Sequence, residues 1–572
     1  MSDRTVEQVV TAPTTIPPPQ AFAAAIHAPI QRREPGMSRR AMFAGGLAAA
    51  AGLMATAGRR AAVQAAPPPA SADVDPGALI NRLVSRITFG ITEAELAQAT
   101  ALGFQGYLDS QLAYESIDDT AVESRISAGA TVNGTAVPAL GTIGRTGQQL
   151  YDTAITPNSN TIVTELIEAT IVRAVYSRRQ LYQRMVEIWT DHFNIDITLD
   201  QETFLKSLDD RTVIRQHAMT TFPQLLSASA HSPAMLYYLN NDLNKYVANN
   251  AASINENYAR EIIELHTFGA NYLYAFPAAD QSTAIRAVAR CFTGWDWYRG
   301  NYAADPTLRA TFRYQQGNHD PNIKQCGPVL DNLTIPARAQ ANGLQDGVDI
   351  LTYLGNHPAT ALYIATKLCR KFLGESCPQS TINAVRDTYL NAANPQGIGD
   401  IKAMLRTILT PANLLDSPLR YKRPFHLFVS AMRAVPTFIV TTGSLRTQLT
   451  KAGHLPFNWG PPDGYPDTTE YWVGLLLPRW NFGGQAPIAS SPTSTGISGV
   501  RMVTTDTGGM LAALTTRDAI VNRLNQALFG GEMNATDKER VRIYMPATGT
   551  ISNTSKQESV GLSIGSPGFQ WY

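Results

Sequence analysis

Apolar residues recur at the three- and four-residue spacing of an α-helix along most of the chain after residue 79. The pattern is longest in NTIVTELIEATIVRAVYSRRQLYQRMVEIWTDHFN, residues 160–194. It also predicts helices near 211–229, 255–270, 281–293, 343–354, 357–373, 380–393, 399–409, 421–434 and 516–529. Alternation typical of strands is sparse. The sequence therefore predicts a mainly α, multi-helical globular protein with little strand.

Three long segments interrupt the helical pattern. Residues 124–160 are rich in Gly, Thr, Ser and Asn, 300–340 contain FRYQQGNHDPNIKQCG, and 453–510 contain many Gly, Pro and aromatic residues. Connections of this length in a compact protein are usually functional or disordered. The aromatic content of 453–482 predicts that this part is ordered.

A separate N-terminal segment precedes the helical region. Arg39 and Arg40 stand before an Ala/Gly-rich run that is shorter than the roughly 20 residues of a membrane span. This arrangement resembles a twin-arginine export signal over 37–66; an ordinary Sec signal and a chance Ala-rich tract are the alternatives. Residues 1–36 are expected to be a disordered leader, or to lie upstream of a true start at Met37. Residues 67–78 read as a linker to a helical domain at 79–572, so we expect a periplasmic or extracellular protein without a stable membrane span.

Composition narrows the partners and the chemistry. Of 572 residues, 44% are hydrophobic and the formal net charge is +1, so no global field draws the chain toward nucleic acid or anionic lipid. CxxC, HExxH and P-loop patterns are absent from the sequence. The four cysteines, Cys291, Cys326, Cys369 and Cys377, allow three pairings. Cys369 and Cys377 are close enough in sequence to bridge, and buried free thiols are the alternative.

The segment NENYAREIIELHTFG, residues 255–269, concentrates charge on one predicted helix. Ser253 and Glu256 fit a capping box at its start. Glu256, Arg260 and Glu264 fall within about 80° on the helix and form a ladder at four-residue spacing. We expect this ladder to be buried and to hold helices together. The alternative is chemical, because Glu261 and Glu264 at three-residue spacing can converge on one centre.

A metal or catalytic site needs partners from other segments. WTDHF contributes His192, and GNHD contributes His319 and Asp320. Imidazole and carboxylate ligands together suit Zn, Mn or Fe, so His192, Glu264, His319 and Asp320 are the predicted metal ligands. Glu261, Glu264, His319 and Asp320 are the predicted catalytic residues. The remaining histidines are expected to pack or to cap helices: His217, His231, His357, His426 and His454, with His266 a core residue.

The aromatic loop offers a second kind of site. Trp459, Tyr465, Trp472 and Trp480 could line a groove in which a sugar polymer stacks on the rings. The alternative is that these side chains cover the helical core, which is the commoner use of large aromatics.

Several segments in order resemble the bacterial family called domain of unknown function 1800 (DUF1800), from about residue 79 to the end. The resemblance implies an exported, predominantly helical protein that often accompanies a second exported family resembling sulfatases and phosphatases. Asp191 and the stretch AFPAADQSTAIRA depart from the usual pattern. The matching segments are LVSRITFG, RMVEIWTDHFN, HSPAMLYYLNN, NENYAREIIELHTFG, ARCFTGW, GNHD, NHPATALYIATKLCRKFLG, KRPFHLFVSAMRA and SPGFQWY.

Two functions from different classes are consistent with these observations. The first is an exported metal-assisted hydrolase acting on an extracytoplasmic ester, glycan or polymer, with Zn, Mn or Fe as its metal. The alternative is a non-catalytic binding or assembly protein that docks a co-exported partner. We favour the hydrolase because histidine and carboxylate residues accompany long ordered loops.

Overall fold

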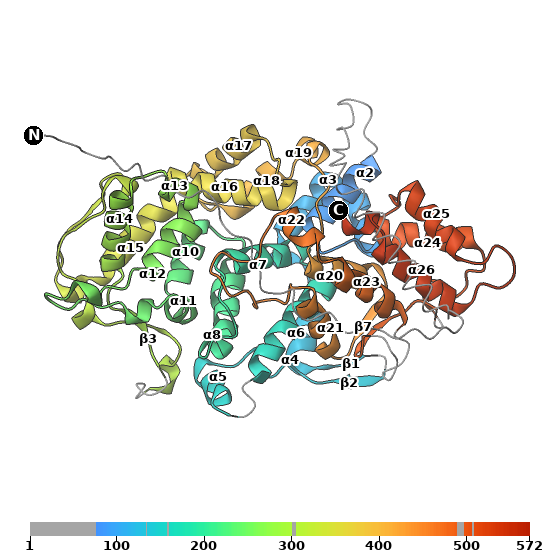
Figure 1. The fold of residues 1–572 in the computed structure, drawn as a ribbon, viewed down its shortest axis with the longest axis horizontal. Coiled ribbons are helices and arrows are strands. Elements are labelled where there is room, and N and C mark those ends of the chain that lie inside the picture. Colours follow the sequence, from blue (N-terminus) through green and yellow to red (C-terminus); the bar gives the residue numbers. More distant parts are fainter. Residues whose placement is uncertain (1–75, 133, 157–159, 300–304, 489–496, 506–507) are drawn as a thin grey trace, which may run out of the picture. The chain divides into compact units, whose positions relative to one another are not determined.

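The computed structural model describes residues 76–572, apart from 133, 157–159, 300–304, 489–496 and 506–507 (Figure 1). The predicted leader (1–36), the predicted signal (37–66) and most of the predicted linker (67–78) lie outside these residues. Helix dominates the described chain, which confirms the mainly α prediction. None of its helices is both long and apolar enough to cross a membrane.

The described chain begins with two helices in contact, α2 (Pro76–Ile87) and α3 (Glu93–Leu112). Thr92 caps α3 by accepting a hydrogen bond from the Glu95 N–H. The predicted loop at 124–160 is largely structured. It contains the end of α4 (Thr120–Ala128), a hairpin of β1 (Ala130–Val132) and β2 (Thr135–Val137), and α5 (Gly147–Ala154). Its Thr and Gln residues serve caps, as in the capping box of Thr146 and Gln149.

The long helical pattern at 160–194 is two helices, α6 (Asn160–Tyr176) and α7 (Gln180–His192). The region predicted as one helix at 211–229 is also divided. After α8 (Glu202–Asp209) the chain passes through a π-helix, η2 (Asp210–Ile214), and the short α9 (Arg215–His217). Two further helices follow, α10 (Phe222–Ala230) and α11 (Pro233–Tyr238).

The charged segment at 255–269 is a helix that changes type. The α-helix α12 (Asn257–Glu261) passes into a π-helix, η5 (Ile262–Thr267), followed by α13 (Ala270–Leu273). The predicted capping box is wrong, because Glu256 occupies the N-cap position. Ser253 instead donates to the Asn250 carbonyl, and Glu256 pairs with Arg286 at 2.8 Å.

The middle of the chain alternates helices with short antiparallel ribbons. The predicted loop at 300–340 pairs β3 (Trp295–Trp297) with β4 (Phe312–Tyr314), and β5 (Lys324–Gln325) with β6 (Thr334–Ile335). The predicted helices are present as α14 (Ala278–Cys291), α15 (Leu344–Asn356), α16 (Pro358–Leu373), α17 (Gln379–Leu390) and α18 (Ile401–Ile408). The short helix α19 (Pro411–Asp416) was not predicted. All four cysteines are free thiols here, and those of Cys369 and Cys377 are in hydrogen-bond contact.

The C-terminal part is a second helical region, in which α24, α25 and α26 lie side by side (Figure 1). Its elements are α20 (Pro424–Ala434), β7 (Thr437–Ile439), α21 (Gly443–Lys451), α22 (Thr469–Val473), α23 (Leu476–Gln485), β8 (Val500–Met502), α24 (Arg517–Phe529), α25 (Ala535–Tyr544) and α26 (Asn553–Gly565). Helix α26 packs closely on α23, where a Cβ on Gly561 would lie 2.6 Å from the Gly483 carbonyl oxygen. Such small-residue packing leaves little hydrophobic periodicity, so α26 was not predicted.

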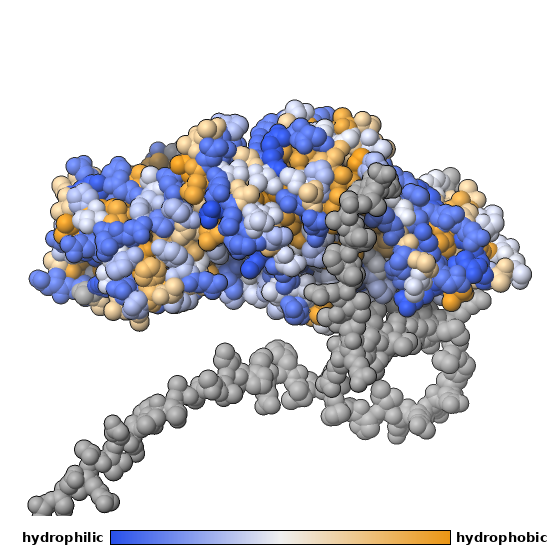
Figure 2. Space-filling view, turned by 90° about the horizontal axis from the view of Figure 1, so that it is seen from above, coloured by the Kyte–Doolittle hydropathy of each residue, from blue (hydrophilic) through white to orange (hydrophobic). Residues whose placement is uncertain are grey.

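Two large hydrophobic clusters form the core. One is built by residues between Ile80 and Leu414, and the other joins α6 to α20–α26. The chain segment 420–422 pairs with the C-terminal residues: Arg420 and Tyr572 exchange backbone hydrogen bonds of 2.8 and 3.0 Å, and the Lys422 N–H donates to the Gln570 carbonyl. The face seen in Figure 2 mixes hydrophilic and hydrophobic residues without one dominant patch.

Candidate functional site

The predicted loop ligand His319 is held in a closed buried network. Its Nδ1 lies 3.0 Å from the Thr293 carbonyl oxygen, and its Nε2 lies 3.2 Å from Asp346 Oδ2. The same carboxylate pairs with Lys324, and all three side chains are fully buried. Burial by itself would raise the pKa of Asp346. The hydrogen bonds from His319, Lys324 and Arg338 outweigh burial and lower this pKa to about 2. Both ring nitrogens of His319 are therefore engaged in structure.

Both carboxylate oxygens of the neighbouring Asp320 also have hydrogen-bond partners in the protein. One carboxylate oxygen accepts from Arg290 Nε at 2.5 Å, and the other accepts from the N–H and amide of Asn322. Burial opposes ionisation, but the Arg290 guanidinium and these donors lower the pKa of Asp320. The carboxylate has little remaining capacity to bind a metal.

The third predicted ligand, His192, lies at the end of α7. Its Nε2 is 3.1 Å from the His266 carbonyl oxygen, so this nitrogen donates and Nδ1 accepts from Lys367 Nζ at 2.8 Å. Burial lowers the pKa of His192, and Lys367 and His266 act in the same direction. The imidazole is thus neutral and fully engaged.

The predicted Glu–Arg–Glu ladder does not form. Glu256 pairs with Arg286, and Glu264 accepts from the Tyr274 hydroxyl at 2.8 Å. Arg260 is half-buried, and no ion pair joins it to either acid in the described part of the chain. Burial, and secondly Glu264, raise the pKa of Glu261 to about 7. A general acid at Glu261 stays a prediction.

Among the described residues, no three His, Cys, Asp or Glu side chains are grouped so that they could hold a metal ion. The structure therefore does not unite His192, Glu264, His319 and Asp320. The physical reason is that each of them already has polar protein partners that fix it in place. Zn, Mn or Fe binding remains a prediction without a ligand set.

The aromatic loop mainly covers the core. Tyr465 and Trp472 are buried, and each donates to a backbone carbonyl, of Leu455 and Pro466 respectively. Trp459 is half-buried and donates to Asp463, and Trp480 is half-buried against Gly565. Two of the four predicted groove residues are therefore hidden from a polymer.

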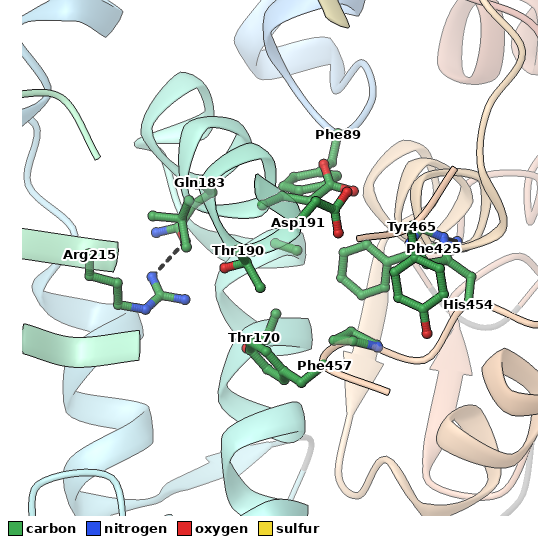
Figure 3. Close-up of a pocket in the computed structure, with 14 residues that line it drawn as sticks. Phe89, Thr170, Gln183, Thr190, Asp191, Arg215, Phe425, His454, Phe457 and Tyr465 are labelled. Carbon is green, nitrogen blue, oxygen red and sulfur yellow. Dashed lines mark hydrogen bonds between the residues drawn. The ribbon is translucent and has the colours of Figure 1, made fainter. Parts of the chain in front are cut away.

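Tyr465 lines a mostly apolar pocket with about 500 Å³ of empty space (Figure 3). The figure shows Asp191 facing Tyr465, Phe425 and His454 across it. Asp191 and the adjacent Glu187 are both bound by Arg423 at 2.6 Å. His454 Nδ1 accepts from the Phe425 N–H, so this histidine packs and caps as predicted. The charges at this pocket are paired with each other, which leaves no free group to react.

A different pocket, with a cavity volume of about 130 Å³, is lined by residues of α2, of the start of α20 and of the C-terminus. Lys422 lines it and is only 5% exposed. Its Nζ lies 3.7 Å from the centre of the Phe569 ring and 3.1 Å from Ser430 Oγ. The described residues place no carboxylate in ion-pair contact with Lys422. Burial, and secondly the charge of Arg479, lower the pKa of Lys422 to about 7.

Ser430 is the natural partner of this lysine. It is 3% exposed on α20 and lines the same pocket, and its Oγ accepts a hydrogen bond from Lys422 Nζ. A neutral lysine can reverse this bond and accept from the hydroxyl. Gly90 faces it: a Cβ at this position, where φ is +143°, would lie 2.6 Å from Ser430 Oγ. A glycine is therefore required for Ser430 to sit in this pocket.

His426 completes the group. The ring lines the pocket, and its buried Nε2 has no hydrogen-bond partner among the described residues. Burial and the charges of Arg184 and Lys422 lower the pKa of His426, so the ring is neutral. The Tyr572 ring lies 4.4 Å away, centre to centre, and holds the imidazole in place.

The sequence contains a spacing that fits this site, although it matches none of the predicted motifs. Lys422, His426 and Ser430 are spaced by four residues in KRPFHLFVS. Residues at this spacing on and before one helix share a face. The three segments that surround the pocket, LVSRITFG, KRPFHLFVSAMRA and SPGFQWY, are also three of those that carry the family resemblance.

Comparison with known proteins supports the family and no more. The profile of the family described as "Protein of unknown function (DUF1800)" matches residues 82–571, nearly the whole chain. Among curated proteins none matches the chain, and among solved structures none matches either. The family match agrees with the ordered segments quoted above. The chain therefore belongs to the DUF1800 family.

Proposed function

We propose that this protein is an exported hydrolase that cleaves an ester bond through Ser430, with Lys422 as its general base. The observation that carries the proposal is the 3.1 Å contact between Lys422 Nζ and Ser430 Oγ in a pocket where the lysine has no carboxylate partner. A lysine can accept a proton only when it is neutral, and burial without a counter-charge is what makes it neutral near pH 7.

The proposed cleavage needs only the ester, water and the side chains of the pocket. Ser430 Oγ attacks the ester carbonyl carbon, and its proton passes to Lys422 Nζ. The carbon–oxygen bond to the leaving alcohol breaks, and the alkoxide takes the proton back from Lys422. Water then attacks the acyl carbon and gives a proton to Lys422. The bond between this carbon and Ser430 Oγ breaks, Oγ takes the proton back from Lys422, and the acid is released. His426 is neutral and its Nε2 is unpartnered, so in the Nε2–H tautomer it would donate to the carbonyl oxygen as charge develops.

This proposal keeps the predicted reaction class and replaces the predicted metal. A metal-assisted reaction needs ligands, and the described residues provide no such group. The ester is favoured over a glycosidic bond because the reacting pair is a hydroxyl and an amine, which suits acyl transfer. Export remains part of the proposal and is supported by Arg39 and Arg40 before an Ala/Gly-rich run.

The direct test uses a serine-directed fluorophosphonate, which forms a covalent bond to an activated hydroxyl. Mass spectrometry of the labelled full chain should place the adduct on Ser430. Ser430→Ala should abolish labelling, and Lys422→Met should slow it by about a hundredfold or more, the usual range for loss of a general base. The control is Ser559→Ala, since this buried serine on α26 already donates to the Ser555 carbonyl and lies outside the pocket.

Cleavage of p-nitrophenyl butyrate gives the second readout. Values of kcat/KM should rise with pH through about 7, because only neutral Lys422 acts as base. Lys422→Arg keeps the positive charge at every accessible pH, so it should not restore cleavage. An adduct on another residue, or labelling of Ser430 that is unchanged in Lys422→Met, would show that the proposed pair does not react.

A further inference from the structure

Part of the wall of the Lys422–Ser430 pocket is apolar. Leu528 and Phe569 are 4% and 1% exposed and face the pocket from the end of α24 and from the C-terminal residues. Ile91, just after α2, adds a third apolar surface. These side chains come from segments far apart in sequence. Asn81 and Glu532 line the pocket as well, so its wall has an apolar part and a polar part.

The mouth of the pocket is also apolar. Leu419 and Trp571 line it and are 54% and 36% exposed. Two large hydrophobic side chains are therefore partly exposed to water at this edge of the pocket. Tyr421 and Trp571 form an antiparallel bridge, and Arg420 and Tyr572 exchange two backbone hydrogen bonds. The rim is thus fixed by the backbone. Exposed apolar side chains that flank a pocket typically mark a surface that a ligand covers.

The two arginines near the pocket, Arg82 and Arg86, donate to backbone carbonyls. Arg82 Nη1 donates to the carbonyls of residues 414, 415 and 417, and Arg86 donates to those of Phe372 and Pro418. A carboxylate or phosphate on the acyl group would need a bidentate cation, and these two arginines already use donors on the backbone. A neutral acyl chain needs no cation in the pocket.

We infer that the acyl group taken by this pocket is a neutral aliphatic chain of about four to eight carbons, which lies along Leu528 and Phe569 and is covered at the mouth by Leu419 and Trp571. The inference rests on the proposed ester hydrolysis at Ser430. Each methylene buried on binding should raise kcat/KM about three- to fourfold until the chain reaches the rim. The substrate class is therefore esters of medium-chain fatty acids, as distinct from acetyl esters and from esters of dicarboxylic acids.

The test compares p-nitrophenyl acetate, butyrate, hexanoate and octanoate with the hemisuccinate ester on the full chain. We expect kcat/KM for hexanoate, which has four more methylenes, to exceed that for acetate by about 80-fold or more, and the hemisuccinate to be the poorest substrate. Leu419→Glu places a charge at the rim and should remove most of the chain-length preference. Leu477→Ser is the matched control, because Leu477 is 65% exposed on α23 and is not in the pocket.

A binding measurement separates this inference from the proposed function. Ser430→Ala removes the nucleophile and keeps the apolar walls, so calorimetric titration with 2-octanone, which cannot be hydrolysed, should still show saturable binding that Leu419→Glu weakens. If 2-octanone binds in this way while no ester is cleaved, the apolar chain site stands and the hydrolase fails. If acetate and hemisuccinate are cleaved as fast as hexanoate, the hydrolase stands and the chain site is overturned.

Discussion

Replacing Lys422 with methionine should stabilise the protein while it abolishes the proposed reaction. Lys422 is 5% exposed, and no carboxylate among the described residues compensates its charge. Burial, then Arg479, lower its pKa from 10.5 to about 7. At 1.36 kcal/mol for each tenfold change in proton affinity, the lysine lowers the free energy of unfolding by about 4 kcal/mol at pH 7. Methionine has a similar length and carries no charge to desolvate, so most of this energy should be recovered.

The pH dependence of this effect has a definite sign. In the unfolded chain the lysine keeps its ordinary pKa of about 10.4, so between about pH 7 and 10 the unfolded state binds more protons than the folded state. The free energy of unfolding contributed by this group therefore rises with pH across that window. The stability difference between Lys422→Met and the parent should be largest at pH 7 and should shrink toward pH 10.

Urea unfolding followed by far-ultraviolet circular dichroism at pH 7 and pH 9.5 measures this difference. Lys451→Met is the matched control, because Lys451 is exposed at the end of α21 and its loss should change stability by less than about 0.5 kcal/mol. The reasoning is refuted if Lys422→Met unfolds at lower urea than the parent at pH 7. It is refuted as well if the difference between the two proteins is the same at both pH values.

Three further predictions concern other parts of the chain. Asp346→Asn should lower the free energy of unfolding by about 3 kcal/mol, because it leaves Lys324 buried without a full counter-charge. Asp349→Asn removes a half-exposed partner of the same Arg338 and should lower this energy by less than about 1 kcal/mol. Equal urea midpoints for the two variants would contradict this. His319→Ala should lower the free energy of unfolding by about 2–4 kcal/mol, because it leaves a cavity and an unpaired Thr293 carbonyl. Arg260→Ala should lower it by less than about 1 kcal/mol. If Arg260→Ala melted at the lower temperature of the two, the prediction of a buried Glu–Arg–Glu ladder would be supported after all. Arg39→Lys combined with Arg40→Lys should leave the precursor in the cytoplasm, and full recovery from the exported fraction would exclude twin-arginine export.

Helix positions were predictable because burial repeats at a local spacing. The ranges expected for α15, α16 and α24 differ from the observed ones by one residue or two at either end. The π-helix η5 was not predictable. Its backbone hydrogen bonds reach the carbonyl five residues earlier, as in the bond from the Phe268 N–H to the Ile263 carbonyl at 2.9 Å. The same residues would also fit an α-helix. Long-range partners decide between the two forms.

The charged candidates failed for a related reason. Spacing on one helix shows which side chains share a face, but it does not show what lies opposite that face. Glu256 has Arg260 four residues away and nevertheless pairs with Arg286 of α14. His319 appeared to lie on an open loop, yet Lys324 and Asp346 enclose it from a strand and from α15. In both cases a partner distant in sequence replaced the local one.

The Lys422 site also depends on residues that are distant in sequence. The spacing of Lys422, His426 and Ser430 is visible in the sequence, but the same pattern on an exposed helix face would be chemically inert. Reactivity requires that the lysine lose its charge, and burial is the main cause of that loss. Phe569, which lies nearly 150 residues later, contributes to this burial, whereas the face of its ring by itself favours the charged amine. The backbone pairing of residues 420–422 with 570–572 brings that ring over the amine. It follows that the C-terminal residues are part of the proposed reacting group even though none of them transfers a proton. A chain that ends before Phe569 would keep Lys422 and Ser430, but it would leave the lysine hydrated and protonated at pH 7, and therefore unable to activate the hydroxyl.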